Sequence, residues 1–246
     1  MKLNIILIFF AIFNIQIGAE NFKLITVLYN EKNPARTKEY LTCLNHNLNH
    51  ELIDTILVIY DTSADDQNNT ILNYLKTKKV TISYANSRQT YGYCFELANK
   101  LYPNSKIILS NADIYFNETL NLLRDYDLTG QFLALTRWNI TKDNSLELFK
   151  QYPRGKFNKD WSESSQDVWI FKTPLHITKA IQIQLGIMNC DSRIAYEAFQ
   201  SGLKVTNPCL TIQCCHLHRT NIRNYNVWAE PYANQPMRPV EWIKLY

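Results

Sequence analysis

The stretch Lys106–Phe116, Lys-Ile-Ile-Leu-Ser-Asn-Ala-Asp-Ile-Tyr-Phe, carries the clearest evidence for the fold. Its apolar first half, bounded by polar residues, predicts a short buried strand. In open α/β sheets, ligands bind just beyond the carboxyl ends of such strands. Asn111 and Asp113 follow there two residues apart, so an extended backbone would direct both side chains to one face. Two such oxygen ligands predict a site for Mg²⁺ or Mn²⁺, although Asn and Asp are also common in turns and helix caps.

The first half of the chain alternates strand-like and helical patterns. Each apolar run ends at polar residues, and each following segment has apolar residues at helical spacing. This βαβαβαβ order predicts a parallel sheet with right-handed crossovers. We expect strands at Lys23–Tyr29, Asp54–Tyr60, Val80–Tyr84 and from Lys106, and helices over residues 40–48, 71–75 and 91–101.

The second half of the chain is predicted to add shorter elements. A long stretch without a clear pattern, Asn139–Ser165, is expected to be a loop, and loops of this length in compact domains are usually functional or disordered. The tail from about residue 219 is expected to be irregular. The predicted elements are a short helix to Arg124, strands over residues 132–137, 167–171, 203–207 and 210–218, and a helix over Asp191–Ser201.

Composition limits the class of protein. The chain is 46% hydrophobic and 20% charged, which suits a single domain over residues 20–246. The net charge of +4 is mild and no Lys/Arg cluster occurs, so nucleic acid is not an expected partner. The sequence has no Gly-x-Gly-x-x-Gly or Walker motif, which argues against a Rossmann dehydrogenase and a P-loop NTPase.

The N-terminus has the pattern of a targeting segment. Lys2 precedes an apolar run from Ile5 to Phe13, and Ile17-Gly18-Ala19 is typical of a cleavage site. We therefore expect residues 1–19 to be a secretory signal peptide, which predicts the ER or Golgi lumen or secretion. The run is shorter than the roughly 20 apolar residues of a membrane span. The alternative is an uncleaved membrane anchor through residues 5–18.

Cysteines and glycosylation sequons also bear on the compartment. Six cysteines allow up to three disulfides in a secreted protein, whereas a reducing compartment would leave buried thiols or ligands. Three Asn-x-Thr sequons fit a luminal glycoprotein, although a chain rich in Asn can contain them by chance. The cysteines are Cys43, Cys94, Cys190, Cys209, Cys214 and Cys215, and the sequons begin at Asn68, Asn117 and Asn139.

Several short blocks, taken in order, resemble the family-2-like GT-A glycosyltransferases of the nucleotide-diphospho-sugar transferase superfamily. The resemblance covers about residues 23–225. It departs from the family pattern by Asn at position 111 and by Asn189-Cys190-Asp191 in place of an acidic pair. The blocks are Ile25–Glu31, Val58–Asp65, Arg88–Asn99, Asn111-Ala-Asp113 (a variant of Asp-x-Asp), Leu135-Thr-Arg-Trp138, Ser165–Lys172, Cys190–Glu197 and His216-Leu-His218.

The resemblance implies both a fold and an activity. The fold would be a GT-A-like, Rossmann-type three-layer α/β sandwich with a mostly parallel central sheet and helices on both faces. The activity would be metal-dependent transfer of a sugar from a nucleotide-diphosphate donor to a hydroxyl of a glycan, lipid or protein acceptor. Mn²⁺ or Mg²⁺ would be the cofactor.

The resemblance also gives roles to residues at the strand ends. Glu31 and Asp61 would bind base and ribose, and the guanidinium of Arg88 would pair with the diphosphate. Asp113 would ligate the metal, with Asn111 assisting or contacting ribose. The alternatives are solvated loop carboxylates or helix caps for the two acids, and a surface side chain for Arg88.

His216 and His218 lie two residues apart on a predicted strand and would therefore share a face. One of them could complete the metal shell or bind the diphosphate. Cys214 falls on the same predicted face, so a zinc site is an alternative, although a fourth ligand is missing. A structural pair of histidines is the other alternative.

Asp191 is expected at the start of a helix, where the resemblance makes it the general base of an inverting transfer. A helix N-cap is its alternative role, and Asp167 is an alternative base. The aromatic side chains of Trp138, Trp161 and Trp169 could stack on an acceptor sugar or belong to the core.

Two other functional classes fit the same residues. A GT-A-like binding protein without activity would keep the sheet and lack the second metal carboxylate. A secreted metal-dependent hydrolase would use Asp113, His216 and His218. Because activated nucleotide sugars occur in the cytosol and in the ER and Golgi lumen, a signal peptide on a transferase predicts a secretory lumen.

Overall fold

The computed structural model describes residues 20–63, 69–150, 162–220, 222, 231–232 and 234–245. The predicted signal peptide, Trp161 and much of the predicted tail lie outside these residues. In the described part of the chain, no helix has the length and apolar character needed to cross a membrane.

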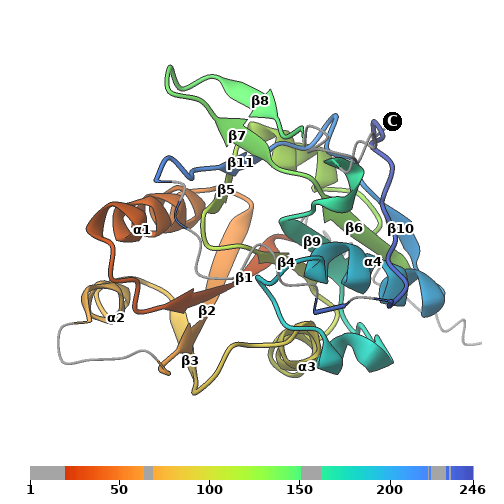
Figure 1. The fold of residues 1–246 in the computed structure, drawn as a ribbon, viewed down its shortest axis with the longest axis horizontal. Coiled ribbons are helices and arrows are strands. Elements are labelled where there is room, and N and C mark those ends of the chain that lie inside the picture. The colour runs from red at the N-terminus through yellow and green to blue at the C-terminus, as the bar shows by residue number, and fades with distance from the viewer. Residues whose placement is uncertain are drawn as a thin grey trace, which may run out of the picture.

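A seven-stranded sheet forms the centre of the molecule (Figure 1). In spatial order its strands are β10 (Lys204–Thr206), β6 (Gln131–Leu135), β9 (Val168–Lys172), β4 (Lys106–Ser110), β1 (Phe22–Tyr29), β2 (Ile53–Asp61) and β3 (Thr81–Ala85). The first four strands of the chain are parallel to one another, as the alternating pattern predicted. They are connected by α1 (Pro34–Leu48), α2 (Thr70–Leu75) and α3 (Tyr91–Leu101).

Helices cover both faces of the central sheet and complete the predicted three-layer α/β sandwich (Figure 1). Side chains of β2 alternate between two cores: Leu57 and Ile59 pack on the face of α3, whereas Val58 and Tyr60 pack on the face of α1 and α2. The remaining helices are α4 (Cys190–Gln200), which packs on the α3 face, and the 3-10 helices η1 (Glu118–Leu123), η2 (Ser162–Ser164) and η3 (Thr178–Gln182).

Close packing of α3 against η3 sets the path of the chain into α4. A Cβ atom at Gly92 would lie 2.5 Å from the backbone nitrogen of Ile181, so only glycine permits this approach. The backbone amides of Tyr91 and Leu185 then pair with the carbonyls of Ile183 and Gln89. These contacts fix the segment that leads to the first turn of α4.

The sheet is mostly parallel, with one exception. β9 runs antiparallel to both of its neighbours, β4 and β6, while β10 is parallel to β6. Because β9 runs the opposite way, its amino-terminal end lies at the carboxyl end of β4. Ser110 and Val168 are opposite each other at that edge.

A second, four-stranded sheet lies beside the central one (Figure 1). The predicted long loop at Asn139–Ser165 is wrong in its first part, because residues 138–148 form a hairpin of two short strands. The predicted strand over residues 210–218 is wrong in its first part as well, since residues 208–212 form a turn. In spatial order the strands are β5 (Ile114–Phe116), β11 (Cys214–His216), β7 (Trp138–Ile140) and β8 (Leu146–Leu148).

All six cysteines are buried and none forms a disulfide, so the expected disulfides are wrong for this structure. Burial raises the pKa of Cys94 and Cys190 to about 12, which keeps both thiols neutral at physiological pH.

The side-chain amide of Asn117, in the second sequon, donates to Gln213 Oε1 at 2.7 Å. Glycosylation of the sequons stays a prediction.

Candidate functional site

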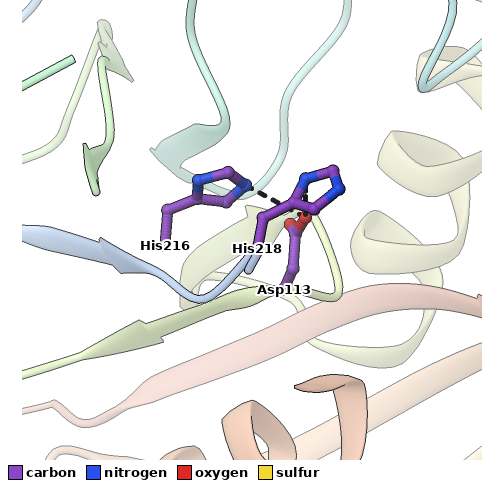
Figure 2. A group of neighbouring side chains, drawn as sticks. All are labelled: Asp113, His216 and His218. Atoms are coloured by element: carbon purple, nitrogen blue, oxygen red, sulfur yellow. Dashed lines mark hydrogen bonds and ion pairs between the residues drawn. The ribbon is translucent and has the colours of Figure 1, made fainter. Parts of the chain in front are cut away.

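Asp113, His216 and His218 lie together beyond the carboxyl end of β4, with both imidazole rings at the Asp113 carboxylate (Figure 2). One ligand atom from each residue lies within 4.8 Å of the others. His216 Nε2 is 3.1 Å and His218 Nδ1 is 3.7 Å from Asp113 Oδ2. One carboxylate oxygen and two ring nitrogens are therefore close enough to bind the same ion.

Backbone pairing between distant segments builds this cluster. Asp113 lies in the turn between β4 and β5, and His216 ends β11, where it is opposite Ile114 of β5. The amide of Leu217 also donates to the Asp113 carbonyl at 2.9 Å. These contacts fix the register, so Asp113 and His216 meet although 103 positions separate them in the sequence.

Helix α1 holds the chain that follows the histidine pair. Arg36, in the first turn of α1, donates to Asp113 Oδ2 at 2.5 Å and to Glu39 Oε2 at 2.7 Å. Glu39 Oε1 in turn accepts from the backbone amides of Arg219 and Thr220, at 2.7 and 2.9 Å. Two carboxylates and one guanidinium leave this group with one net negative charge when the histidines are neutral.

The surroundings shift the protonation of Asp113 and His218 in directions that favour metal binding. Burial alone would raise the pKa of Asp113, but His216 and then Arg36 lower it well below its usual range. Burial, together with the charge of Arg36, lowers the pKa of His218 to about 4. An ionised carboxylate and a neutral imidazole are the forms that ligate metal ions.

The donor set fits a divalent cation. Ligand atoms about 2.1 Å from one ion lie at most about 4.2 Å apart, so shifts of less than about 1 Å would bring all three atoms onto it. Two imidazoles and a carboxylate suit Mn²⁺ or Zn²⁺ better than Mg²⁺, which prefers oxygen ligands. Arg36 would share the Asp113 carboxylate with such an ion.

The structure separates Asn111 from this cluster. β4 ends at Ser110 and a turn follows, so the expectation that Asn111 and Asp113 share one face of an extended strand is wrong. Asn111 Nδ2 donates instead to Asp167 Oδ1 at 2.9 Å. Asp167 Oδ2 accepts from Arg137 Nη1 at 2.8 Å, so both oxygens of Asp167 already have donors.

Asp191 lies in the first turn of α4, but the N-cap is Asn189, so the alternative role of Asp191 as N-cap is wrong. Its two carboxylate oxygens accept from the backbone amides of Gln166 and Ser192, each at 3.0 Å. Burial raises the pKa of Asp191 to about 7, against the lowering effect of these amides and with a further rise from Asp167. A carboxyl group with this pKa can accept a proton at neutral pH.

The segment before β9 connects the two aspartates. Asp167 binds the side chain of Asn111, which follows β4, and the preceding residue, Gln166, binds Asp191 through its amide. Asp113 and Asp191 therefore both lie at the edge of the sheet where β4 ends and β9 begins.

The other predicted site residues follow neighbouring strands at the same edge, and each has partners within the protein. Arg88 donates to the carbonyls of Leu185 and Gly186, at 3.3 and 2.7 Å, and so supports the segment before α4. Glu31 and Asp61 are half-buried and accept hydrogen bonds from their own loops: Glu31 from Asn33 N and Tyr29 Oη, and Asp61 from Ser63 N.

Two predicted site residues belong instead to the hydrophobic core. Trp169 is 1% exposed and packs edge to face with Tyr91, so of its two interpretations the core role is confirmed. Cys214 is fully buried among core residues of β5 and η1 and is not in the ligand cluster. Trp138 is half-buried, and its indole nitrogen donates to the Cys209 carbonyl at 2.8 Å.

Sequence reasoning missed the residues that hold the cluster in place. Arg36 and Glu39 are an i, i+3 ion pair on α1, a spacing usually assigned to an exposed helix face. Arg137 falls within the block Leu135-Thr-Arg-Trp138, which resembles the family, and Asn139 begins a sequon. Neither pattern indicates a role at the cluster. The side chains of Arg36 and Glu39 are buried by contacts with distant residues, so the sequence carried no specific signal for them.

Solved structures show the same fold. The chain is similar to a mannosyltransferase from Pyrobaculum calidifontis in complex with GDP-Man and Mn²⁺, with a TM-score of 0.50 and 12% identity over 82% of this chain and 58% of that one. It is also similar to GalNAc-T7 with UDP, GalNAc and Mn²⁺, with a TM-score of 0.53 and 12% identity over 89% of this chain and 46% of that one.

These comparisons establish the architecture: the chain has a GT-A-type fold. It spans about half the length of the two solved proteins. No family model matches the sequence, and no curated protein matches it either.

Proposed function

We propose that the protein is a metal-dependent glycosyltransferase that moves a sugar from a nucleotide-diphosphate donor to an acceptor hydroxyl. The observation that carries this proposal is the gathering of Asp113, His216 and His218 within 4.8 Å, beyond the carboxyl end of β4 in a GT-A-type fold. The acceptor would be a glycan, a lipid or a protein.

Each residue would have one role at this edge of the sheet. Asp113, His216 and His218 would hold Mn²⁺, which offsets negative charge on the leaving diphosphate when bound. Glu31 and Asp61 would bind base and ribose. Arg88, whose Nη1 donates to the carbonyls of Leu185 and Gly186, would pair with the diphosphate.

Asp191 would act as the general base of an inverting transfer. The acceptor oxygen forms a bond to the anomeric carbon while the bond from that carbon to the diphosphate oxygen breaks, and the hydroxyl proton passes to Asp191. Support comes from its pKa of about 7 and its partial exposure. Asp167 is a poorer candidate because Arg137 and Asn111 occupy its oxygens.

A GT-A-like binding protein without activity is the second candidate. Asn111 pairs with Asp167 rather than with the cluster, and Arg36 already neutralises Asp113. Such a protein would keep the fold and bind neither metal nor nucleotide tightly.

Thermal unfolding with Mn²⁺, with and without UDP, separates these candidates. A ligand at 100 times its dissociation constant stabilises the folded state by about 2.7 kcal/mol, which is easily measured. We expect UDP to stabilise the protein only when Mn²⁺ is present. Stabilisation by metal with no nucleotide effect would favour a hydrolase, and no response to either would favour the inactive binding protein.

The location of the protein is a separate proposal. We propose that residues 1–19 direct it to the secretory pathway, with an anchor through residues 5–18 as the alternative. Six unpaired thiols give this proposal no support, and N-terminal sequencing of the mature protein would test it.

A further inference from the structure

We propose that Asn139, held by Arg137, is a positioning residue that aims His216 Nε2 at the metal ion. This inference rests on the proposed metal site and adds residues to it that bind neither metal nor substrate. A chain of hydrogen bonds supports the inference. It runs from His216 through Asn139 and Arg137 to Asp167.

The small sheet places Asn139 directly beside His216. β7 and β11 are parallel neighbours, and their register pairs Asn139 with His216. The Asn139 Oδ1 atom lies 2.9 Å from His216 Nδ1, while the other ring nitrogen, Nε2, lies 3.1 Å from Asp113 Oδ2. The ring is therefore held at both of its nitrogens, by Asn139 on one side and by the cluster on the other.

Arg137 determines which atom of the Asn139 amide faces the ring. Arg137 Nε lies 3.3 Å from Asn139 Oδ1, and an arginine nitrogen can only donate. The atom that meets both Arg137 and His216 must therefore be the carbonyl oxygen of Asn139. It follows that His216 Nδ1 carries a proton, which leaves the lone pair of Nε2 for a bound metal ion.

Arg137 is itself held by residues that flank β8 and β9. It is buried, donates to Asp167 Oδ2 at 2.8 Å and to Ser165 Oγ at 3.3 Å, and lies over the Phe149 ring with 3.8 Å between its guanidinium carbon and the ring centroid. A guanidinium held this way moves little, so Asn139 has a fixed anchor. Hydrogen-bonded supports of this kind orient metal-binding histidines in other proteins.

Titration of the metal-free protein with Mn²⁺ by calorimetry tests this inference. Asn139→Leu removes the acceptor at similar size, and we expect it to weaken Mn²⁺ binding by about 10–100-fold. Asn139→Asp keeps an oxygen facing both donors, so its affinity should equal or exceed that of the wild type. Ile140→Ala is the matched control, because the next residue on β7 points to the opposite side and the variant loosens the same hairpin.

The outcomes separate the inference from the proposed function. Equal Mn²⁺ affinity in Asn139→Leu and wild type would overturn the role of Asn139 and leave the metal site intact. Equal weakening in Ile140→Ala would also overturn it, since hairpin stability alone would then explain the loss. A wild-type protein that binds no Mn²⁺ would overturn both proposals.

A second measurement does not need any variant at Asn139 to fold. In protein labelled with ¹⁵N-histidine, two-bond ¹H–¹⁵N correlation spectra show which ring nitrogen carries the proton. We expect His216 of the metal-free protein to be protonated at Nδ1, with the signal assigned from His216→Gln. A ring protonated only at Nε2 would overturn the inference.

Discussion

Asp113 and Asp191 lie at the same edge of the central sheet and differ in what surrounds them. Asp113 meets a guanidinium and two imidazoles, supplied by α1 and by the chain in and after β11. Asp191 accepts from two backbone amides. Accordingly, the pKa of Asp113 lies well below its usual range, whereas burial raises that of Asp191 to about 7.

This difference shows that burial alone does not set the state of a carboxyl group. Removal from water favours the neutral form in both cases. The charges and hydrogen bonds around Asp113 outweigh that preference, whereas the two amides at Asp191 do not. The permanently charged group suits a role in holding a cation, and the group that titrates near neutrality suits proton transfer. Substitutions at either aspartate test this comparison, and an exposed aspartate serves as the reference.

Loss of the Asp191 carboxylate is expected to have the largest effect. If the proposed transfer occurs, Asp191→Asn should lower turnover by about 10²–10⁴-fold, because no general base remains. The kcat/KM of the wild type should rise with pH toward a plateau above about pH 7, where Asp191 is ionised. Initial-rate measurements with a panel of nucleotide sugars would check both statements. Full turnover in Asp191→Asn would exclude Asp191 as the base.

Loss of the Asp113 charge should lower the free energy of unfolding. Asp113→Asn leaves the buried guanidinium of Arg36 with Glu39 alone, and removing one partner of a buried ion pair typically costs about 3–5 kcal/mol. Urea unfolding of the metal-free protein would measure this. A cost below about 1 kcal/mol would mean that Arg36 and Asp113 interact no more strongly than an exposed pair.

The raised pKa of Asp191 predicts a pH-dependent effect on stability. In the unfolded chain its carboxyl ionises near pH 4, whereas in the folded protein it keeps its proton until about pH 7. The contribution of Asp191 to stability therefore falls as pH rises between these values and is level above them. The Asn variant lacks this fall, so it should gain up to about 4 kcal/mol relative to wild type.

Urea unfolding of both proteins across this pH range would follow the difference between their unfolding free energies. A difference that stays constant with pH would show that Asp191 titrates like an exposed carboxyl, and the contrast with Asp113 would disappear.

The smallest effect is expected at an exposed aspartate. Asp54 accepts from Lys23 at 2.7 Å, and its side chain is 40% exposed. Asp54→Asn should change stability by less than about 1 kcal/mol, because water screens the pair. Measured beside Asp113→Asn, it isolates the contribution of burial to an aspartate ion pair. A comparable loss in both variants would refute that explanation.

The parallel half of the fold could be predicted because its strands are long and its helices amphipathic. β1 and β2 are mostly apolar, and the spacing of apolar residues predicts the helix Tyr91–Leu101. The small sheet was missed because strands of three residues, such as β7 and β8, are too short to show a period of two. The antiparallel direction of β9 depends on neighbours that are distant in sequence.

The candidate site was partly predictable. The spacing His216-Leu-His218 and the position of Asp113 after a buried strand pointed to the ligands, since local pattern determines where a strand ends. The placement of Asn111, Arg36 and Asn139 was not predictable, because each depends on contacts with residues far along the chain.

By itself, the sequence determined the order of strands and helices in the parallel half and the residue types capable of binding a cation, because both follow from local periodicity and side-chain chemistry. Only the tertiary structure decided which of those residues meet. The pairing of β11 with β5 and β7 gathers Asp113, His216 and Asn139, and the packing of α1 adds Arg36. Hydrogen-bond register sets the distances between these side chains, and burial sets their charge states. Both depend on the tertiary structure, because they arise only between segments that are far apart in the chain.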